Sequence, residues 1–109
     1  MKVKLKFNNF IAKIINVGAI TLYPYILFSI DRATAEKYKI IEHEMIHVRQ
    51  VRKLGWLKFY VSYIYLYFKN LWKYHNGSMA YNHIEYEVEA YENQHTVVLT
   101  PEELEEIQS

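Results

Sequence analysis

The chain has 109 residues, of which 51% are apolar, and this length supports one domain with one modest core. The formal net charge is +1, so the composition gives no electrostatic reason to expect a nucleic-acid partner. The absence of cysteine excludes disulfide bonds and thiolate metal sites, so a transition metal would be held by histidine and carboxylate side chains.

The first thirty residues predict a small sheet. Strict alternation of lysine with apolar residues over Lys2–Phe7 predicts a strand at a sheet edge. Phe10–Val17 predicts a short helix or an irregular segment, which Gly18 ends. Ala19–Ser29 is rich in β-branched and aromatic residues, and Pro24 predicts an edge strand or a bulge because it lacks an N–H group. Such an edge could pair with an extended peptide by strand addition.

The start of the chain is basic and is followed by an apolar region, as in a secretory signal peptide. Its apolar region is interrupted by Lys13 and Asn16, and no small-x-small cleavage pattern follows. We therefore expect no signal peptide and a cytoplasmic location, which the absence of cysteine also fits.

Residues 35–54 predict one helix. Asp31 or Thr34 is suited to cap its start, and Gly55 follows its last periodic residue. One face carries the apolar residues of this segment. A second face carries His43 and His47, with Gln50 one turn further on, where it could hydrogen-bond a ligand or cover the site.

The second face contains the pattern H-E-x-x-H. His43 and His47 are four residues apart, so both imidazoles project from one side of a helix and can bind one Zn²⁺. Glu44 lies beside them, where a carboxylate can accept a proton from an activated water. The alternative is a pair of buried histidines without a metal, which would not need this spacing.

Trp56–Trp72 is the most apolar stretch of the chain and ends before Asn76-Gly77. We interpret it as a buried helix packed on the metal helix. Membrane contact is the alternative, because the length approaches that of a minimal membrane span and aromatic residues lie at both ends. Lys58 and Lys69 weaken the case for a span.

The last third of the chain predicts two more helices. Asn82–Gln94 is a helix candidate, because Asn82 and Glu85 have the spacing of a capping box. Ser78–Tyr81 before it is expected to be a loop or an extra turn, and Thr96–Leu99 is prone to form a strand. Thr100-Pro101 marks a helix start, and the acidic residues 102–108 that follow predict a solvated terminal helix.

A catalytic zinc site needs a third protein ligand. The candidates downstream are His75, His83, His95, Glu85, Glu87, Glu89 and Glu92. Glu87 and Glu89 are about 200° apart on a helix, so they cannot both face one metal. Glu89 shares a face with Glu85 and Glu92, which favours a solvent-side role. The residues thus favour Glu87 and leave Glu89, a histidine, or no third ligand as alternatives.

These motifs resemble those of the glutamate-type zincins (gluzincins), in which H-E-x-x-H is followed on a later helix by E-x-x-A. The sequence Glu87-Val88-Glu89-Ala90 has that form, and the first motif reads His43-Glu44-x-x-His47-x-x-Gln50. Together with the aromatic helix, the two motifs resemble small, uncharacterised bacterial and phage proteins of this type. The resemblance extends over roughly residues 19–94.

The resemblance implies a zincin-like domain that binds Zn²⁺, acts on a peptide or protein substrate and uses Glu87 as the third ligand. Many such enzymes have an aspartate where this chain has Tyr91, and that aspartate orients a ligand histidine. The role is therefore vacant here or taken by another residue. A tyrosine such as Tyr81 or Tyr91 could instead stabilise an oxyanion.

The sequence therefore predicts a single α+β domain over residues 1–109, with a small N-terminal sheet beside a helical core. The leading hypothesis is a zinc-dependent peptidase with His43, His47 and Glu87 as metal ligands and Glu44 as general base. The rival is a non-catalytic zinc-binding module that docks to a membrane or a partner through Trp56–Trp72. Glu44 favours the enzyme, because a structural zinc site does not need an unliganded carboxylate.

Overall fold

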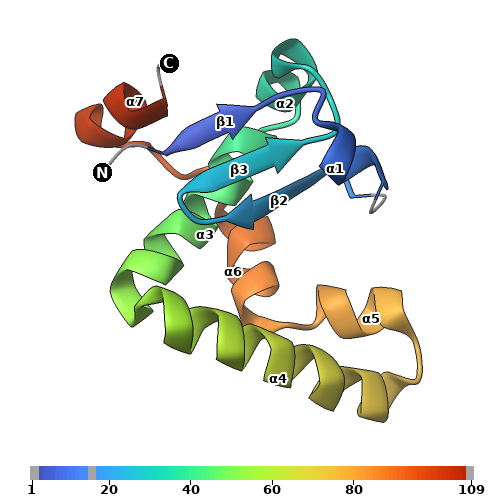
Figure 1. Ribbon diagram of the computed structural model, residues 1–109. Helices are drawn as coiled ribbons and strands as arrows, with labels where there is room; N and C mark the ends of the chain where they lie inside the picture. The colour runs from blue at the N-terminus through green and yellow to red at the C-terminus, as the bar shows by residue number, and fades with distance from the viewer. Residues whose placement is uncertain (1–2, 15–16, 108–109) are drawn as a thin grey trace.

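A three-stranded sheet lies across helix α3 in the computed structural model, which describes residues 3–14 and 17–107 (Figure 1). The described residues form an α+β domain, as predicted. The strands are β1 (Lys4–Lys6), β2 (Ala19–Leu22) and β3 (Tyr25–Phe28), and the helices are α1 (Phe10–Ile14), α2 (Arg32–Lys37), α3 (Ile40–Leu54), α4 (Trp56–Tyr74), α5 (Gly77–Asn82), α6 (Glu85–Asn93) and α7 (Pro101–Ile107).

The sheet has the order β1-β3-β2, so both β1 and β2 are edge strands. β1 runs parallel to β3 with Leu5 opposite Ile26, and β2 runs antiparallel to β3 with Thr21 opposite Ile26. The prediction of a lysine-flanked edge strand is confirmed for β1, while Lys2 of the predicted range lies outside the described residues. The predicted helix over 10–17 is α1, with residues 15 and 16 also outside the description.

Residues 19–29 form a hairpin. Pro24 lies in the turn between β2 and β3, after a cis peptide bond. The prediction that Pro24 belongs to an edge strand or a bulge is therefore wrong. Proline has no N–H group to donate to a neighbouring strand, and a turn position does not require one. The edge strand expected in this region is β2.

The single helix predicted over 35–54 is two helices. Asp31 caps α2 by accepting a hydrogen bond from the Thr34 amide at 2.8 Å, and α2 ends at Tyr38. Lys39 then adopts a left-handed conformation with φ 60°, which starts α3 in a new direction. The periodicity of the sequence did not reveal this break, because apolar spacing continues across it. Gly55 ends α3 as predicted.

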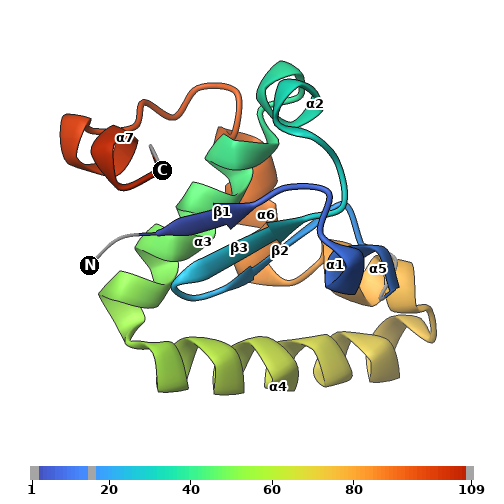
Figure 2. The same ribbon diagram turned by 45° about the horizontal axis from the view of Figure 1, so that its top comes forward.

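The predicted helix over Trp56–Trp72 is α4, but the expectation that its apolar surface is buried is wrong. Phe59 is the one residue of α4 that is fully buried. Trp72 is 83% exposed and Phe68 60% exposed. α4 contacts α3 and α5 with one side and leaves the opposite side uncovered (Figure 2). No described helix is both long and apolar enough to cross a membrane.

The elements after α4 differ from the prediction at their ends. His75 ends α4, and Asn76 caps a further helix, α5, through the Met79 amide. The capping box proposed for Asn82 and Glu85 is wrong, because Asn82 closes α5 and α6 begins at Glu85. A reciprocal cap does form at α7, where the Thr100 amide donates to Glu103 and the Glu103 amide donates to the Thr100 hydroxyl.

Residues 96–99 form no strand, contrary to expectation. They place Leu99 in the core, beside Ile107 of α7. The predicted solvated terminal helix is therefore only partly solvated, because Ile107 and Glu103 are buried. The core lies between the sheet and α3, and its buried members are Val3, Ile26, Phe28, Ala35, Ile41, Met45, Val48, Leu99 and Ile107. This packing fixes the position of α3.

Candidate metal centre

The H-E-x-x-H residues lie on a buried part of α3. His43, Glu44 and His47 are each about 5% exposed or less, and one ligand atom from each lies within 4.8 Å of the others. The two imidazole rings are one helical turn apart, with ring centroids 5.0 Å from each other. This cluster could bind a metal ion, which the spacing on one helix face predicted.

Glu87 of α6 brings a carboxylate to both histidines. Its Oε1 lies 3.0 Å from His43 Nε2, and its Oε2 lies 3.1 Å from His47 Nε2. The second contact lacks hydrogen-bond geometry, so His47 Nε2 is buried without a hydrogen bond to a described residue. Three side chains therefore converge, and His47 contributes a buried imidazole nitrogen that a metal would satisfy.

The donor set is compatible with a tetrahedral metal ion. Ligand atoms about 2.1 Å from such an ion lie about 3.4 Å from each other. The contacts of Glu87 with His43 and His47, at 3.0 and 3.1 Å, are a few tenths of an ångström shorter. Small outward movements of the side chains would open the required space.

Each candidate ligand histidine is held by a glutamine. His43 Nδ1 lies 2.7 Å from Gln94 Oε1, and His47 Nδ1 lies 2.8 Å from Gln50 Oε1. An amide oxygen can only accept, so both Nδ1 atoms are the protonated ones and both Nε2 atoms are directed at Glu87. This is the arrangement by which metal-binding histidines are usually oriented.

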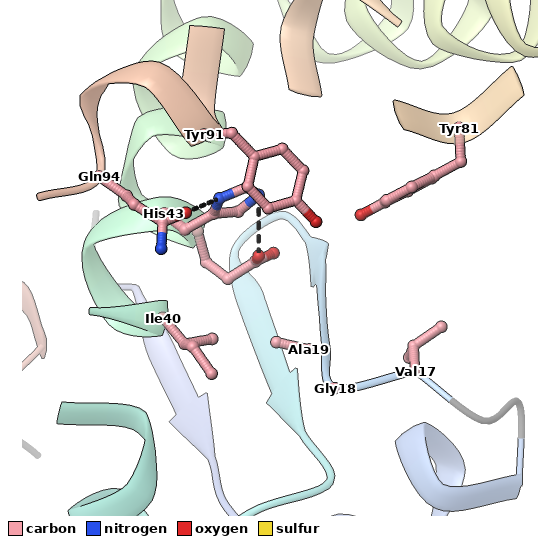
Figure 3. Close-up of a pocket in the computed structure, with 9 residues that line it drawn as sticks. Val17, Gly18, Ala19, Ile40, His43, Tyr81, Tyr91 and Gln94 are labelled. Carbon is pink, nitrogen blue, oxygen red and sulfur yellow. Dashed lines mark hydrogen bonds and ion pairs between the residues drawn. The ribbon is translucent and has the colours of Figure 1, made fainter. Parts of the chain in front are cut away.

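Gln50 connects the metal helix to α6. Its Nε2 donates to the Tyr86 carbonyl oxygen at 3.1 Å and to Glu89 Oε1 at 2.5 Å. Glu89 therefore supports Gln50 and contacts neither histidine. Gln50 thus hydrogen-bonds His47, one of the candidate ligands, which is one of the roles expected for it. Gln94 hydrogen-bonds His43, which is the orienting role that Tyr91 cannot take as an aspartate would. The ring of Tyr91 instead packs edge-on against His43 with centroids 4.5 Å apart (Figure 3).

Glu44 points away from the histidines toward the sheet with one of its oxygens. Its Oε1 accepts a hydrogen bond of 2.9 Å from the Thr21 hydroxyl of β2, while its Oε2 lies 3.8 Å from His43 Nε2. Burial raises the pKa of Glu44, although the neighbouring histidines oppose the shift. Thr21 thus orients a carboxylate whose affinity for a proton is increased.

The pKa values of Glu87 and His47 both shift against the effect of burial. Burial acts to raise the pKa of Glu87, but its contacts with His43 and His47 outweigh burial and hold that pKa far below its usual range. Burial acts to lower the pKa of His47, but Glu87 and the charge of Glu44 raise it to about 9. Glu87 is therefore a carboxylate at neutral pH, which is the form that binds metals, whereas His47 is protonated without a metal and a bound metal would displace that proton.

Three tyrosines surround the centre. The Tyr63 hydroxyl of α4 donates to Glu87 Oε2 at 2.7 Å. The Tyr81 and Tyr91 hydroxyl groups point toward one another across the mouth of the site (Figure 3). Burial and the charge of Glu87 raise the pKa of Tyr63 and of Tyr81, so both remain hydrogen-bond donors at neutral pH.

Two cavities open beside the centre, with volumes of about 400 and 330 Å³. Both are bordered by Ala19 of β2, by Glu44 and by Tyr81. The larger cavity continues past His43 and Gln94, whereas the smaller one is lined mainly by apolar groups of β2 and α4. Glu44 therefore lies where the two cavities meet, along the free edge of the sheet.

The other histidines lie apart from this cluster of described residues. His75 ends α4, His83 stacks on Tyr74 with centroids 4.5 Å apart, and His95 is exposed. Sequence reasoning did not identify Thr21, Tyr63 or Gln94. Gln94 follows Glu87 by seven residues, which on a helix gives nearly the same face, and this spacing could have indicated it. Thr21 and Tyr63 depend on the tertiary packing.

No family model, curated protein or solved structure matches this chain.

Proposed function

We propose that this protein is a zinc-dependent hydrolase of the glutamate-zincin type that cleaves peptide bonds. His43, His47 and Glu87 are the ligands, and Glu44 is the general base. The observation that carries the proposal is the position of Glu87, which directs one oxygen at each Nε2 while a glutamine holds each Nδ1. A buried cluster of this kind matches a metal-ligand set more closely than a packing core.

When bound, Zn²⁺ would supply a Lewis acid that activates water and polarises a carbonyl group. Glu44 would accept a proton from the attacking water and pass it to the leaving amine. Thr21 occupies Oε1 of Glu44, so Oε2 is the oxygen that remains for the proton. The raised pKa of Glu44 suits this role, since a general base works best when its pKa lies near the operating pH.

The substrate would lie along β2. The Ser29 amide donates to the Gly18 carbonyl oxygen, so by the antiparallel alternation the main-chain groups of Ala19 and Thr21 face the free edge. The Tyr60 hydroxyl already donates to the Thr21 carbonyl oxygen at 3.0 Å and leaves the Ala19 end for an extended peptide. Tyr81 and Tyr91 would donate to the oxygen of the scissile carbonyl.

A second ligand set must be distinguished from this one. Among the described residues, His43, Glu44 and His47 form a group whose ligand atoms lie within 4.8 Å of one another, so Glu44 itself could be the third ligand. We favour Glu87 as the ligand, because both of its oxygens face the imidazole nitrogens, whereas Thr21 holds one oxygen of Glu44. A non-catalytic zinc-binding module is the alternative function.

The test compares Glu44→Gln with Glu87→Gln. Each protein is first stripped of metal and then given one equivalent of Zn²⁺, and its zinc content is measured. Cleavage of a mixed peptide library is measured by mass spectrometry. We expect Glu87→Gln to lose zinc, and Glu44→Gln to keep zinc while cleavage falls by roughly 10²- to 10⁴-fold. Glu92→Gln, an exposed carboxylate of α6, is the matched control.

Loss of zinc in Glu44→Gln but not in Glu87→Gln would assign the ligand role to Glu44. Undiminished cleavage in zinc-loaded Glu44→Gln would refute the general-base mechanism. Tight zinc binding without cleavage of any library peptide by the unmodified chain would favour the non-catalytic module.

A further inference from the structure

The outer side of α4 carries a row of large apolar side chains. They are between 56% and 83% exposed, and they form what we call the α4 stripe: Leu57, Val61, Ile64, Tyr65, Phe68 and Trp72. Their spacings of three, four and one residues place them on one side of a helix. α4 runs along the outside of the domain, so this side meets no other described element (Figure 2).

The stripe is unusual for a helix that is free in water. Contiguous apolar surface on a domain of this size marks a contact with another molecule. The core does not use this surface, because Phe59 on the opposite side of α4 is its one fully buried residue. α4 also does not combine the length and the apolar content that are needed to cross a membrane. A helix with one apolar side is instead suited to lie along an interface.

The charge around the stripe is entirely basic. The sequence has no acidic residue between Glu44 and Glu85, although the whole chain has a net charge of only +1. α4 carries three exposed lysines, Lys58, Lys69 and Lys73. At about 100° per residue, all three lie along one border of the α4 stripe. An apolar side bordered by lysines is complementary to an anionic lipid surface.

We propose that α4 binds the surface of an anionic lipid bilayer, with the stripe at the boundary between headgroups and acyl chains and the lysines on lipid phosphates. Trp72 belongs to the stripe and lies near the end of α4, which suits this position because tryptophan prefers the headgroup level. A second copy of the chain is a poorer occupant. Its own α4 would bring the same three lysines and no acidic residue to pair with them.

The proposed binding surface adjoins the candidate metal centre. Ile64 belongs to the stripe and also lines the smaller cavity, together with His47 and Glu44. A bilayer on the stripe would therefore lie beside the mouth of that cavity. This inference does not depend on the proposed function, because lipid binding needs neither zinc nor hydrolysis.

The chain contains its own reporter for the test. Its two tryptophans, Trp56 and Trp72, are both on α4 and are 65% and 83% exposed. Their fluorescence is recorded while vesicles are added to the full chain, and binding is measured by co-sedimentation. We expect a blue shift and sedimentation with vesicles of phosphatidylcholine and phosphatidylglycerol, and neither with phosphatidylcholine alone. Added salt should weaken the binding.

Two variants test the two components of the surface. Val61→Ser with Phe68→Ser removes apolar area, and we expect partitioning to fall at least about tenfold. Charge reversal of Lys58, Lys69 and Lys73 to Glu should lower it by roughly a hundredfold or more, since each lysine near an anionic surface contributes roughly fivefold. The matched controls are Val98→Ser, which is 82% exposed, and reversal of the exposed Lys4, Lys6 and Lys37.

The lysine variant keeps the apolar stripe intact, so it tests the proposal even if the serine variant folds poorly. Absence of a blue shift and of sedimentation with the anionic vesicles would overturn the proposal. Equal binding to the neutral vesicles, or equal loss in the matched controls, would also overturn it. A dimer in sedimentation velocity that dissociates in the Phe68→Ser variant, without lipid binding, would assign the stripe to a second copy.

Discussion

Helices α3 and α4 follow one another in the chain but differ in which side chains they bury. α3 buries nine of its fifteen residues, and four of those nine are the polar residues His43, Glu44, His47 and Gln50. α4 has a larger share of apolar residues, yet Phe59 is the one residue of nineteen that is fully buried. Apolar content alone therefore predicts the reverse of what the two helices do.

The difference follows from what covers each helix. The sheet packs on one side of α3, α6 packs on another, and α7 is joined to it by ion pairs from Arg49 and Arg52 to Glu103 and Glu106. His43, Glu44 and Gln50 find hydrogen-bond partners on β2 and α6, which is the usual condition for burying polar groups. His47 bonds Gln50 of α3 itself, and its Nε2 has no hydrogen bond to a described residue. α4 contacts α3, α5, α6 and β2 with one side, so the apolar groups of its other side stay exposed.

The largest expected effect concerns the metal ligands of α3. His47→Ala removes one of the three proposed ligands, so zinc binding should be abolished. His95→Ala, which replaces an exposed histidine, should leave one zinc per chain. The measurement is metal analysis of protein dialysed against a known free zinc concentration. Equal zinc content in both variants would remove the basis for treating α3 as a metal helix.

A second prediction compares stability across the two helices. Met45 of α3 is fully buried, and Met45→Ala should lower the free energy of unfolding by about 2–5 kcal/mol. Phe68 of α4 is 60% exposed, and Phe68→Ala should change it by less than about 0.5 kcal/mol. Urea denaturation in the absence of lipid measures both. A large cost at Phe68 would mean that the stripe is covered within the protein.

A third prediction addresses the glutamines that hold the histidines. Gln50→Ala and Gln94→Ala should each weaken zinc binding by about 10- to 100-fold, the usual effect of losing a group that orients a ligand. Asn93→Ala, which removes an exposed amide on α6, is the control and should leave affinity unchanged. Competition with a zinc chelator gives the constants. Unaltered affinity in both glutamine variants would show that the hydrogen bonds do not orient the ligands.

The smallest effect concerns the attachment of α7 to α3. The ion pair with Arg49, and then the cap at Thr100, lower the pKa of Glu103 to about 2 from a model-compound value of 4.5. A lowered folded-state pKa stabilises the protein fully above pH 4.5, and this stabilisation is lost as the pH falls toward 2. The pair should contribute only about 1 kcal/mol, because the Arg49 side chain is 40% exposed to screening solvent.

Thermal unfolding followed from pH 6 to pH 2 measures this contribution. Glu103→Gln should be less stable at pH 6 and should lose less stability on acidification than the unmodified chain. Glu102→Gln, an exposed neighbour on α7, is the control and should follow the unmodified curve. Parallel curves for Glu103→Gln and the unmodified chain would mean that the ion pair does not stabilise the domain.

Local chemistry made part of the fold predictable. The alternation in β1, the cap at Asp31, the end of α3 at Gly55 and the start of α7 at Pro101 each depend on residues within one turn. The break at Lys39 was not predictable, because a left-handed lysine has no sequence signature and the apolar spacing continues through it. The exposure of α4 was not predictable either, because apolar content does not say which face finds a partner.

The site divides in the same way. His43, Glu44, His47 and Gln50 lie on one helix, so their spacing alone placed them on one face. Glu87 was preferred from the E-x-x-A pattern and from its angle to Glu89, and the structure brings its carboxylate to the two histidines. Thr21 and Tyr63 reach the site from β2 and α4. Their roles arise from packing between distant segments, which the sequence does not encode locally.

Gly55 joins α3 to α4 as a single-residue corner. Its φ of 87° and ψ of 144° are strained for any residue with a side chain, although a Cβ there would touch no atom within 4 Å. The requirement for glycine is thus conformational and not steric. Gly55 is at once the C-cap of α3 and the N-cap of α4, so its backbone conformation sets the angle between the two helices. A change in the direction of α4 relative to α3 would have to occur at Gly55, because no other residue lies between the two helices.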